Sequence, residues 1–289
     1  MFLTDHRVSP SKALVIQAVC VTVGLCLLLI TRIVEATTKR GAAYNDPATV
    51  TPLSDTGTVI WAYNWDMKEA SNLPAHFEFV PMLRHADFGG WDTSVEQARL
   101  RGSSYILGFN EPDMTSQANL SPSVAAGYYK NYITPYQGTF KLLSPAVTSS
   151  TSAGMGLQWL DLFMRECTSC GISGLVVHWY GDSADDFKSF VKNAISFAEA
   201  HDFSEVWITE FALNADVDGV TDQTSSVRFI EDVTSWLDNQ PSVARYSYFM
   251  CAEGYLLSGG SLNSAGKAYV APSRSIAPTI SSNSCAVTS

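Results

Sequence analysis

The segment YILGFNEPD, residues 105–113, changes from apolar to polar within one residue, and this change indicates the fold. Its first five residues read as a buried strand, whereas Asn110 and Glu111 are polar. Pro112 cannot continue a central strand, because it has no backbone N–H to donate. The segment therefore predicts a buried strand that ends where a carboxylate begins. A second segment, VWITEFA at residues 206–212, places another glutamate among strand-forming residues in the same way.

Short apolar runs of this kind alternate with segments that can hold a helix, which is the pattern of parallel strands joined by helical crossovers. The predicted strands are 58–63, 77–82, 105–110, 142–147, 175–179, 206–210 and 246–250. The predicted helices are 95–101, 123–133, 156–166, 184–200 and 225–239. Ser121 and Pro122 offer a cap and a first-turn proline to the second of these helices. Along 184–200, apolar residues recur every three to four positions, so one face of this helix should pack on a sheet.

This alternation predicts an α/β fold, either an open doubly wound sheet or a closed eight-stranded barrel. A nucleotide-binding sheet would carry a Gly-rich loop after its first strand, but Asn64-Trp65-Asp66 follows there. We therefore predict a (β/α)8 TIM barrel in a single domain. The eighth strand is not evident, and residues 84–90 are the best gap for it. The segment after residue 250 reads as loop.

The first forty residues have the features of a targeting or membrane-anchoring segment. Ala13 to Ile30 has no charge, which predicts a signal peptide or an N-terminal membrane anchor. Lys39-Arg40 resembles a dibasic processing site. The expected segments are a leader at 1–36, a processed or linking segment at 37–57, the barrel at 58–275 and a C-terminal tail at 276–289. The chain is expected to be secreted or in the cell wall, with a type II membrane anchor as the alternative.

Charge and cysteine content limit the binding partners and the covalent links that the chain can have. The chain has 28 acidic and 18 basic residues, so nucleic acid is a disfavoured partner. The protein is expected to be a monomer. The cysteines beyond the leader are Cys167, Cys170, Cys251 and Cys285. An even number in an oxidising compartment favours disulfides, either within the CxxC pair or from it to one of the other two. Zinc is disfavoured, because there is no second CxxC or spaced histidine pair.

Two glutamates stand at the ends of predicted strands, Glu111 and Glu210. In a barrel the carboxyl ends of the strands meet at one rim, where the chemistry is placed. Paired carboxylates suit the cleavage of a glycosidic bond, because one protonates the leaving oxygen while the other attacks or stabilises the sugar cation. The alternative is that each glutamate is solvated or paired with a nearby Arg or Lys.

Aromatic residues near the same rim fit a sugar ligand, because the apolar face of a pyranose packs on aromatic rings. The candidate platforms are Trp61, Trp65, Trp91, Trp179 and Tyr180, each of which is alternatively a core residue. Strand alternation places His178 and Tyr180 on one face and Trp179 on the other. Trp179 therefore packs under helices or turns into the cleft. His178 is either a hydrogen-bond partner of the substrate or nucleophile, or a buried structural histidine.

Three motifs carry a resemblance to a known family: GFNEPD at 108–113, HWY at 178–180 and WITEFA at 207–212. Together they resemble glycoside hydrolase family 128, the Asl1-like glycosyl hydrolase catalytic domain common in fungi, over about 58 to 269. The resemblance implies a (β/α)8 barrel and a retaining endo-β-1,3-glucanase that acts on β-glucan and needs no cofactor or metal. It also implies that Glu111 is the general acid/base, Glu210 the nucleophile, and Asn110 the residue that holds a sugar 2-hydroxyl. Further substrate-binding candidates at the strand ends are Tyr63, Asn64, Trp65, His178, Trp179, Tyr180 and Tyr248.

The chain departs from the family pattern at two positions. Many members have a tryptophan after Pro-Met-Leu and another in the last strand, where this chain has Arg84 and Tyr248. Both changes bear on the shape of the sugar subsites and on linkage preference, and both leave the carboxylate pair intact. The rival interpretations are a non-hydrolytic protein that binds or links cell-wall glucan, and a glycosidase of another linkage.

Overall fold

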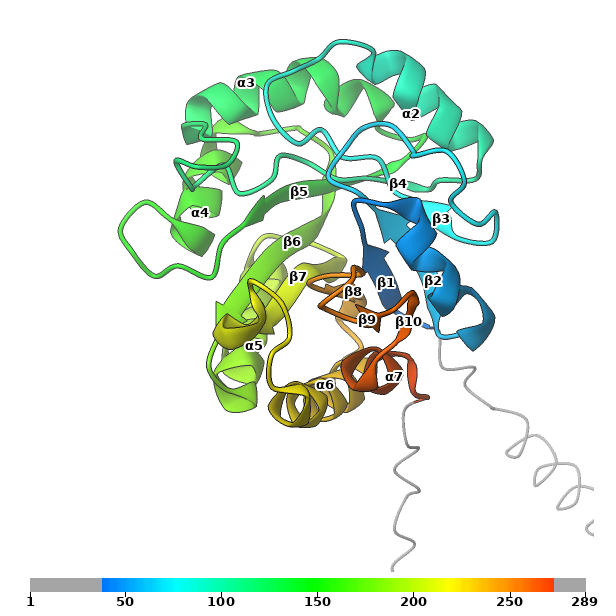
Figure 1. Cartoon of the computed structure of the whole chain (residues 1–289). Coiled ribbons are helices and arrows are strands. Elements are labelled where there is room, and N and C mark those ends of the chain that lie inside the picture. The colour runs from blue at the N-terminus through cyan, green and yellow to red at the C-terminus, as the bar shows by residue number, and fades with distance from the viewer. Residues whose placement is uncertain (1–37, 273–289) are drawn as a thin grey trace, which may run out of the picture. The chain divides into compact units, whose positions relative to one another are not determined.

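The part of the chain that the computed structural model describes, residues 38–272, contains eight strands that pair in parallel as one sheet. The strands are β1 (Arg40–Ala43), β2 (Val59–Tyr63), β3 (Glu78–Phe79), β4 (Tyr105–Ile106), β5 (Lys141–Val147), β6 (Ile172–Gly181), β7 (Glu205–Leu213) and β8 (Val243–Tyr248). Their order in the sheet is β3-β2-β1-β8-β7-β6-β5-β4. Figure 1 shows this sheet curling into a barrel, with the helices on its outside.

Backbone hydrogen bonds just beyond β3 and β4, the two end strands of the sheet, close the barrel. Met82 and Leu107 form a parallel bridge, and Leu107 N donates to Pro81 O over 3.0 Å. Gly108 follows, where an added Cβ would lie 2.8 Å from Pro145 N, so only glycine lets β4 and β5 approach this closely. The prediction of a (β/α)8 barrel is therefore confirmed.

All seven predicted strands are present, but the prediction for the eighth was wrong. The missing strand is β1, whereas residues 84–90 lead into the helix that follows β3. The sequence of β1 is RGAA, which has none of the β-branched or aromatic residues that mark a strand. Small residues are needed here, because a Cβ on Gly41 would lie 2.2 Å from the Trp61 ring.

The predicted linking segment 37–57 thus contains a strand of the barrel, β1, in the part that the structure describes. The basic pair at its start is buried: Lys39 is 9% exposed and Arg40 3%. Arg40 donates to Tyr246 Oη over 2.8 Å and to Asp238 Oδ2 over 2.7 Å, which ties β1 to β8 and to the helix before it. The predicted leader at 1–36 and tail at 276–289 lie outside the described residues.

The five predicted helices are all present. They are α2 (Trp91–Leu100), α3 (Pro122–Tyr132), α4 (Gly156–Glu166), α5 (Ala184–Ala200) and α6 (Gln223–Asp238). Ser121 caps α3 by accepting from Val124 N, and Pro122 occupies its first turn. The apolar stripe of α5 is turned inward as predicted, with Phe187 and Val191 fully buried.

Several elements were not predicted from the sequence. After residue 250, where a loop was predicted, the chain forms β9 (Leu257–Ser258), β10 (Ser261–Leu262) and α7 (Ser264–Val270). Three 3₁₀ helices complete the description: η1 (Pro47–Thr56), η2 (Thr134–Tyr136) and η3 (Asn214–Asp216). Within residues 38–272, no helix combines the length and apolar character needed to span a bilayer.

The cysteines follow one of the predicted alternatives. Cys167 and Cys170 form a disulfide across the turn after α4. Cys251 carries a free thiol that is buried, and its Sγ donates to Thr49 O over 3.0 Å. Cys285 lies outside the residues that the structure describes.

Apolar side chains form two separate cores. One lies between the strands and the surrounding helices, and the other fills the barrel lumen. At the amino-terminal end of the lumen, Trp61 and Trp207 pack with ring centroids 5.0 Å apart, and Arg245 lies over both rings. This floor supports the opposite end of the lumen, where Glu111 and Glu210 lie.

Arg40→Ala should destabilise the fold by about 3–5 kcal/mol, because it removes a buried guanidinium that bonds to Tyr246 and to the partly buried carboxylate of Asp238. Urea denaturation followed by circular dichroism measures the change. Arg99→Ala is the control, since Arg99 pairs with Glu96 on the exposed face of α2, and it should shift the free energy of unfolding by less than about 0.5 kcal/mol. Equal stabilities for the two variants would contradict the role given to Arg40.

Candidate active site

A cavity of about 580 Å³ opens at the carboxyl ends of the barrel strands, which is the end where barrel enzymes place their chemistry. Its size is within the range of ordinary small-molecule sites. It is lined by Asn45, Trp65, Arg84, Asn110, Glu111, Met114, Gln117, Tyr180, Glu210, Val217, Phe249 and Met250. Both predicted catalytic glutamates are in this set.

Glu111 stands at a sharp backbone turn after β4. Its φ is +42°, in the left-handed region that glutamate rarely adopts, and its N–H donates to Ala146 O over 2.7 Å. Asp113, two residues later, accepts hydrogen bonds from the Thr148 hydroxyl and from Gly156 N. These bonds hold the turn, and the turn directs a carboxylate that is only 6% exposed into the cavity.

Glu210 lies within β7 and receives two hydrogen bonds on its carboxylate. The Trp65 indole donates to Oε1 over 2.7 Å, and the Tyr180 hydroxyl donates to Oε2 over 2.5 Å. Burial and the Glu210 carboxylate raise the pKa of Tyr180 well above its ordinary value, so this hydroxyl remains a donor. Glu210 is thus an oriented carboxylate with a proton donor on each oxygen.

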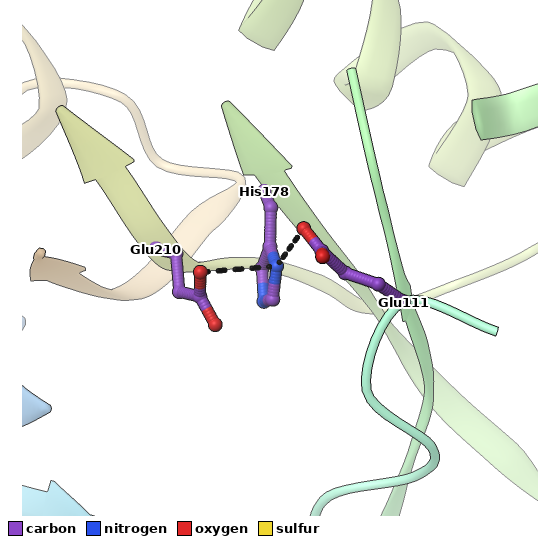
Figure 2. A group of neighbouring side chains, drawn as sticks. All are labelled: Glu111, His178 and Glu210. Carbon is purple, nitrogen blue, oxygen red and sulfur yellow. Dashed lines mark hydrogen bonds and ion pairs between the residues drawn. The ribbon is translucent and has the colours of Figure 1, made fainter. Parts of the chain in front are cut away.

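His178 lies between the two glutamates, as Figure 2 shows. Its Nδ1 is 3.0 Å from Glu111 Oε1 and 3.5 Å from Glu210 Oε2, and its Nε2 is 2.9 Å from Thr209 Oγ1. Burial disfavours the charged imidazole, but Glu210 and Glu111 together outweigh burial and raise the pKa of His178 above its ordinary value. The two carboxylates therefore stabilise the protonated form of the imidazole ring.

The same three residues are the one group among the described residues whose side chains could hold a metal ion. A ligand atom from each of Glu111, His178 and Glu210 lies within 4.8 Å of the others. In this arrangement, however, His178 Nδ1 is hydrogen-bonded to Glu111. His178 Nδ1 must carry a proton to bond either carboxylate, while a metal would require that nitrogen to be unprotonated.

The structure brings together most of the residues predicted to bind substrate. Asn110, Trp65 and Tyr180 line the cavity, and His178 lies directly beneath it. The Oδ1 atom of Asn110 is buried and has no hydrogen-bond partner, so it is an acceptor ready for a ligand hydroxyl. Tyr63 is fully buried behind Trp65, with ring centroids 5.1 Å apart, and supports that ring from below.

Other predicted residues lie elsewhere. Trp179 packs under the helices, 5.1 Å from Phe187 and 5.8 Å from Phe229, because strand alternation turns it away from the lumen. Tyr248 also points outward and donates to the buried Asp216. Asn64 bonds within its own loop, to Lys68 O and Asp66 N. Of the other candidate platforms, Trp61 is in the lumen floor and Trp91 donates to Tyr132 O at the start of α2.

Arg84, which the sequence connected with the shape of the sugar subsites, lines the cavity. Several other cavity residues were not assigned to the site from the sequence. They are Asn45, Met114, Gln117, Val217, Phe249 and Met250. Asn45 follows β1, so recognising that strand would have placed it at the rim. Phe249 and Met250 stand at the end of the last predicted strand, where the rule used for the glutamates also applies. Met114, Gln117 and Val217 are loop residues without a local signal.

A barrel that sets two buried glutamates within a few ångströms of each other at its carboxyl end has the arrangement of a glycoside hydrolase. The sequence matches the glycosyl hydrolase catalytic core family over residues 41–269. It is also similar to a solved family 128, subgroup III, curdlan-specific exo-β-1,3-glucanase from Blastomyces gilchristii in complex with glucose. The identity is 39%, over 80% of this chain and 97% of that one, with a TM-score of 0.74. The chain therefore belongs to glycoside hydrolase family 128, as the sequence motifs predicted.

Two further relatives differ in activity or length. A family 128 endo-β-1,3-glucanase from Amycolatopsis mediterranei in complex with laminaritriose is 27% identical, over 81% of this chain and 98% of that one, with a TM-score of 0.65. Alkali-sensitive linkage protein 1 of Schizosaccharomyces pombe is 29% identical over 250 residues, which is 80% of this chain but 44% of that protein. The chain thus spans less than half the length of this curated relative.

His178 should keep its proton to a pH above 6.5, the ordinary value for histidine, and Glu111→Gln should lower its pKa by removing one of the two anions. NMR titration of the imidazole nitrogens measures both. Because the folded pKa is the higher one, His178 contributes stability that is complete below pH 6.5 and is lost as the pH rises through the folded pKa. Glu205→Gln, at the far end of β7, should leave the titration unchanged. An identical titration in Glu111→Gln and the wild type would contradict the coupling.

Proposed function

We propose that this chain is a retaining endo-β-1,3-glucanase that hydrolyses β-glucan through a glycosyl-enzyme intermediate. The observation that carries the proposal is the separation of the two carboxylates, because an oxygen of Glu111 and an oxygen of Glu210 lie within 4.8 Å. Retaining glycosidases place their carboxyl groups about 5 to 5.5 Å apart, whereas inverting enzymes need roughly 6.5 to 9.5 Å to admit a water molecule.

The hydrogen bonds around each glutamate support different roles. Glu210 has donors on both oxygens and faces the cavity as an oriented anion, which suits the nucleophile. Glu111 bonds to His178 through one oxygen, which leaves its other oxygen available to the glycosidic bond. His178 is then a positioning residue that holds Glu111 in place and carries positive charge between the two acids.

The proposed reaction follows in two steps. In the first, Glu111, which is protonated in the substrate complex, gives its proton to the glycosidic oxygen while Glu210 attacks the anomeric carbon, so the bond to the leaving sugar breaks as the bond to Glu210 forms. In the second, Glu111 takes a proton from water, whose oxygen displaces Glu210 at the same carbon. The unpartnered Oδ1 of Asn110 accepts from a sugar hydroxyl, in agreement with the 2-hydroxyl contact implied by the family resemblance.

Glu210→Gln should lower turnover of laminarin-type glucan by several orders of magnitude while oligosaccharide binding remains, because the amide keeps the shape but does not attack. Reducing-sugar assays and calorimetry measure the two quantities. Glu205→Gln on the same strand is the control and should retain turnover per folded molecule. With azide, Glu210→Ala should form an α-glycosyl azide, whereas Glu111→Ala should form the β-anomer. Normal turnover in Glu210→Gln would refute the assignment.

The mode of attack has a second candidate, an exo action, which the 39% identity to an exo-β-1,3-glucanase favours. The two modes give different early products from a long β-1,3-glucan. An endo enzyme releases a range of oligosaccharides and shortens the polymer quickly, whereas an exo enzyme releases one short product. Mass spectrometry of early time points from laminarin and from defined oligosaccharides should show the range. A single product from every substrate would replace the endo proposal with the exo one.

A non-hydrolytic role in binding or linking wall glucan is the remaining candidate, because a linkage protein is among the relatives. Both glutamates and Asn110 stand in a complete site, which supports turnover over this role. A panel of β-1,3-glucan, mannan and xylan distinguishes these outcomes, since a purely binding protein would retain glucan without releasing sugars. The secreted or wall location predicted from the leader stays a prediction.

A further inference from the structure

We propose that Arg84, together with Gln117, forms a subsite that binds the hydroxyl groups of a neutral glucosyl residue next to the cleaved bond and thereby sets substrate affinity. This inference rests on the proposed function. Arg84 lies directly beside Asn110, because Asn110 N donates to Arg84 O over 2.9 Å where the barrel closes. The rigid barrel, rather than a free loop, therefore places this arginine at the cavity.

Arg84 has donor capacity that the rest of the structure does not use. It is the one Lys or Arg among the residues that line the cavity, and it is exposed there. Within residues 38–272, no carboxylate lies within ion-pair distance of it and no aromatic ring stacks on it. Its hydrogen bond to Gln117 Oε1 is long, at 3.5 Å. A guanidinium offers five N–H donors in a fixed fork, so most of them are available to a ligand.

The neighbouring side chains indicate which ligand fits. Gln117 Oε1 also lies 3.5 Å from Asn110 Nδ2, so the three side chains make one continuous polar wall. This wall presents donors from Arg84 and an acceptor, the buried Oδ1 of Asn110. A hydroxyl group both donates and accepts, and therefore matches both. A carboxylate or phosphate accepts only, and would leave Oδ1 without a partner.

The surroundings of Glu210 have a different character. Trp65, Tyr180 and Phe249 form an aromatic wall around Glu210, with Phe249 about equally close to the other two rings, at 5.9 and 5.5 Å between centroids. A sugar whose anomeric carbon meets Glu210 lies against these rings. The hydroxyl groups of the sugar are held at the polar wall, where Asn110 Oδ1 accepts and Arg84 donates. The cavity therefore combines stacking around Glu210 with hydroxyl recognition at the polar wall.

Arg84→Ala should raise KM for β-1,3-gluco-oligosaccharides about tenfold or more and change kcat less than about threefold, because bonds to a charged donor are lost from bound substrate. Arg84→Lys should show nearly the same rise in KM, since lysine keeps the charge but lacks the fork. Gln117→Ala should raise KM less. The pH profile of kcat should be unchanged in all three. Arg165→Ala is the control, because Arg165 pairs with Asp161 on the surface of α4.

Three results would overturn the inference: an unchanged KM in Arg84→Ala, full recovery in Arg84→Lys, or tighter binding of oligosaccharides that contain a uronic acid than of neutral ones. The second would assign a role to charge alone, and the third would assign an acidic ligand. If the wild-type chain neither binds nor hydrolyses β-1,3-glucan, the proposed function itself fails. If the wild type is active and Arg84→Ala equals it, only the subsite assignment fails.

Discussion

The arrangement of the active site depends on placing two largely buried carboxylates close together. Glu111 and Glu210 are 6% and 5% exposed, and two ionised carboxylates whose oxygens lie within 4.8 Å would repel each other by about 3 kcal/mol or more at an effective dielectric constant near 20. His178 is the compensating group, because its ring hydrogen-bonds to Glu111 and also lies within ion-pair distance of Glu210. The barrel makes this possible: β6 lies beside β7, and His178 pairs in register with Glu210.

The contrast between the two ends of the lumen shows why these glutamates differ from others in the same fold. At the amino-terminal end, Glu205 forms an ion pair with Lys141, and Glu78 forms one with Arg245. There the alternative considered from the sequence, a glutamate neutralised by Lys or Arg, is what the structure contains. At the carboxyl end neither glutamate has such a partner among the described residues. One strand, β7, thus carries an ion-paired acid at its start and the proposed nucleophile five residues later.

Much of the site could be predicted because strand periodicity and strand ends are local properties. Alternation along β6 placed His178 and Trp179 on opposite faces; in the structure His178 faces the lumen and Trp179 packs under the helices, which is one of the two predicted alternatives. Tyr248 was predicted to bind substrate, but alternation along β8 turns it outward to Asp216. Strand β1 escaped prediction because tertiary packing determines it: the Trp61 ring leaves room only for small residues at Gly41. Strand β1 is buried because of the side chains that pack around it, and its own sequence, RGAA, gives no sign of this.

Under the proposed function, catalysis and substrate selection come from different parts of this fold. Glu210 and His178 stand within strands, and Glu111 stands at a turn fixed by bonds to Ala146 and through Asp113, so the barrel itself sets their spacing. Gln117 and Val217 stand on loops after β4 and β7, where residues can change without disturbing the strands. Substitutions in the walls can therefore alter which glucan end or length is held, while the carboxylates keep the separation that the reaction requires.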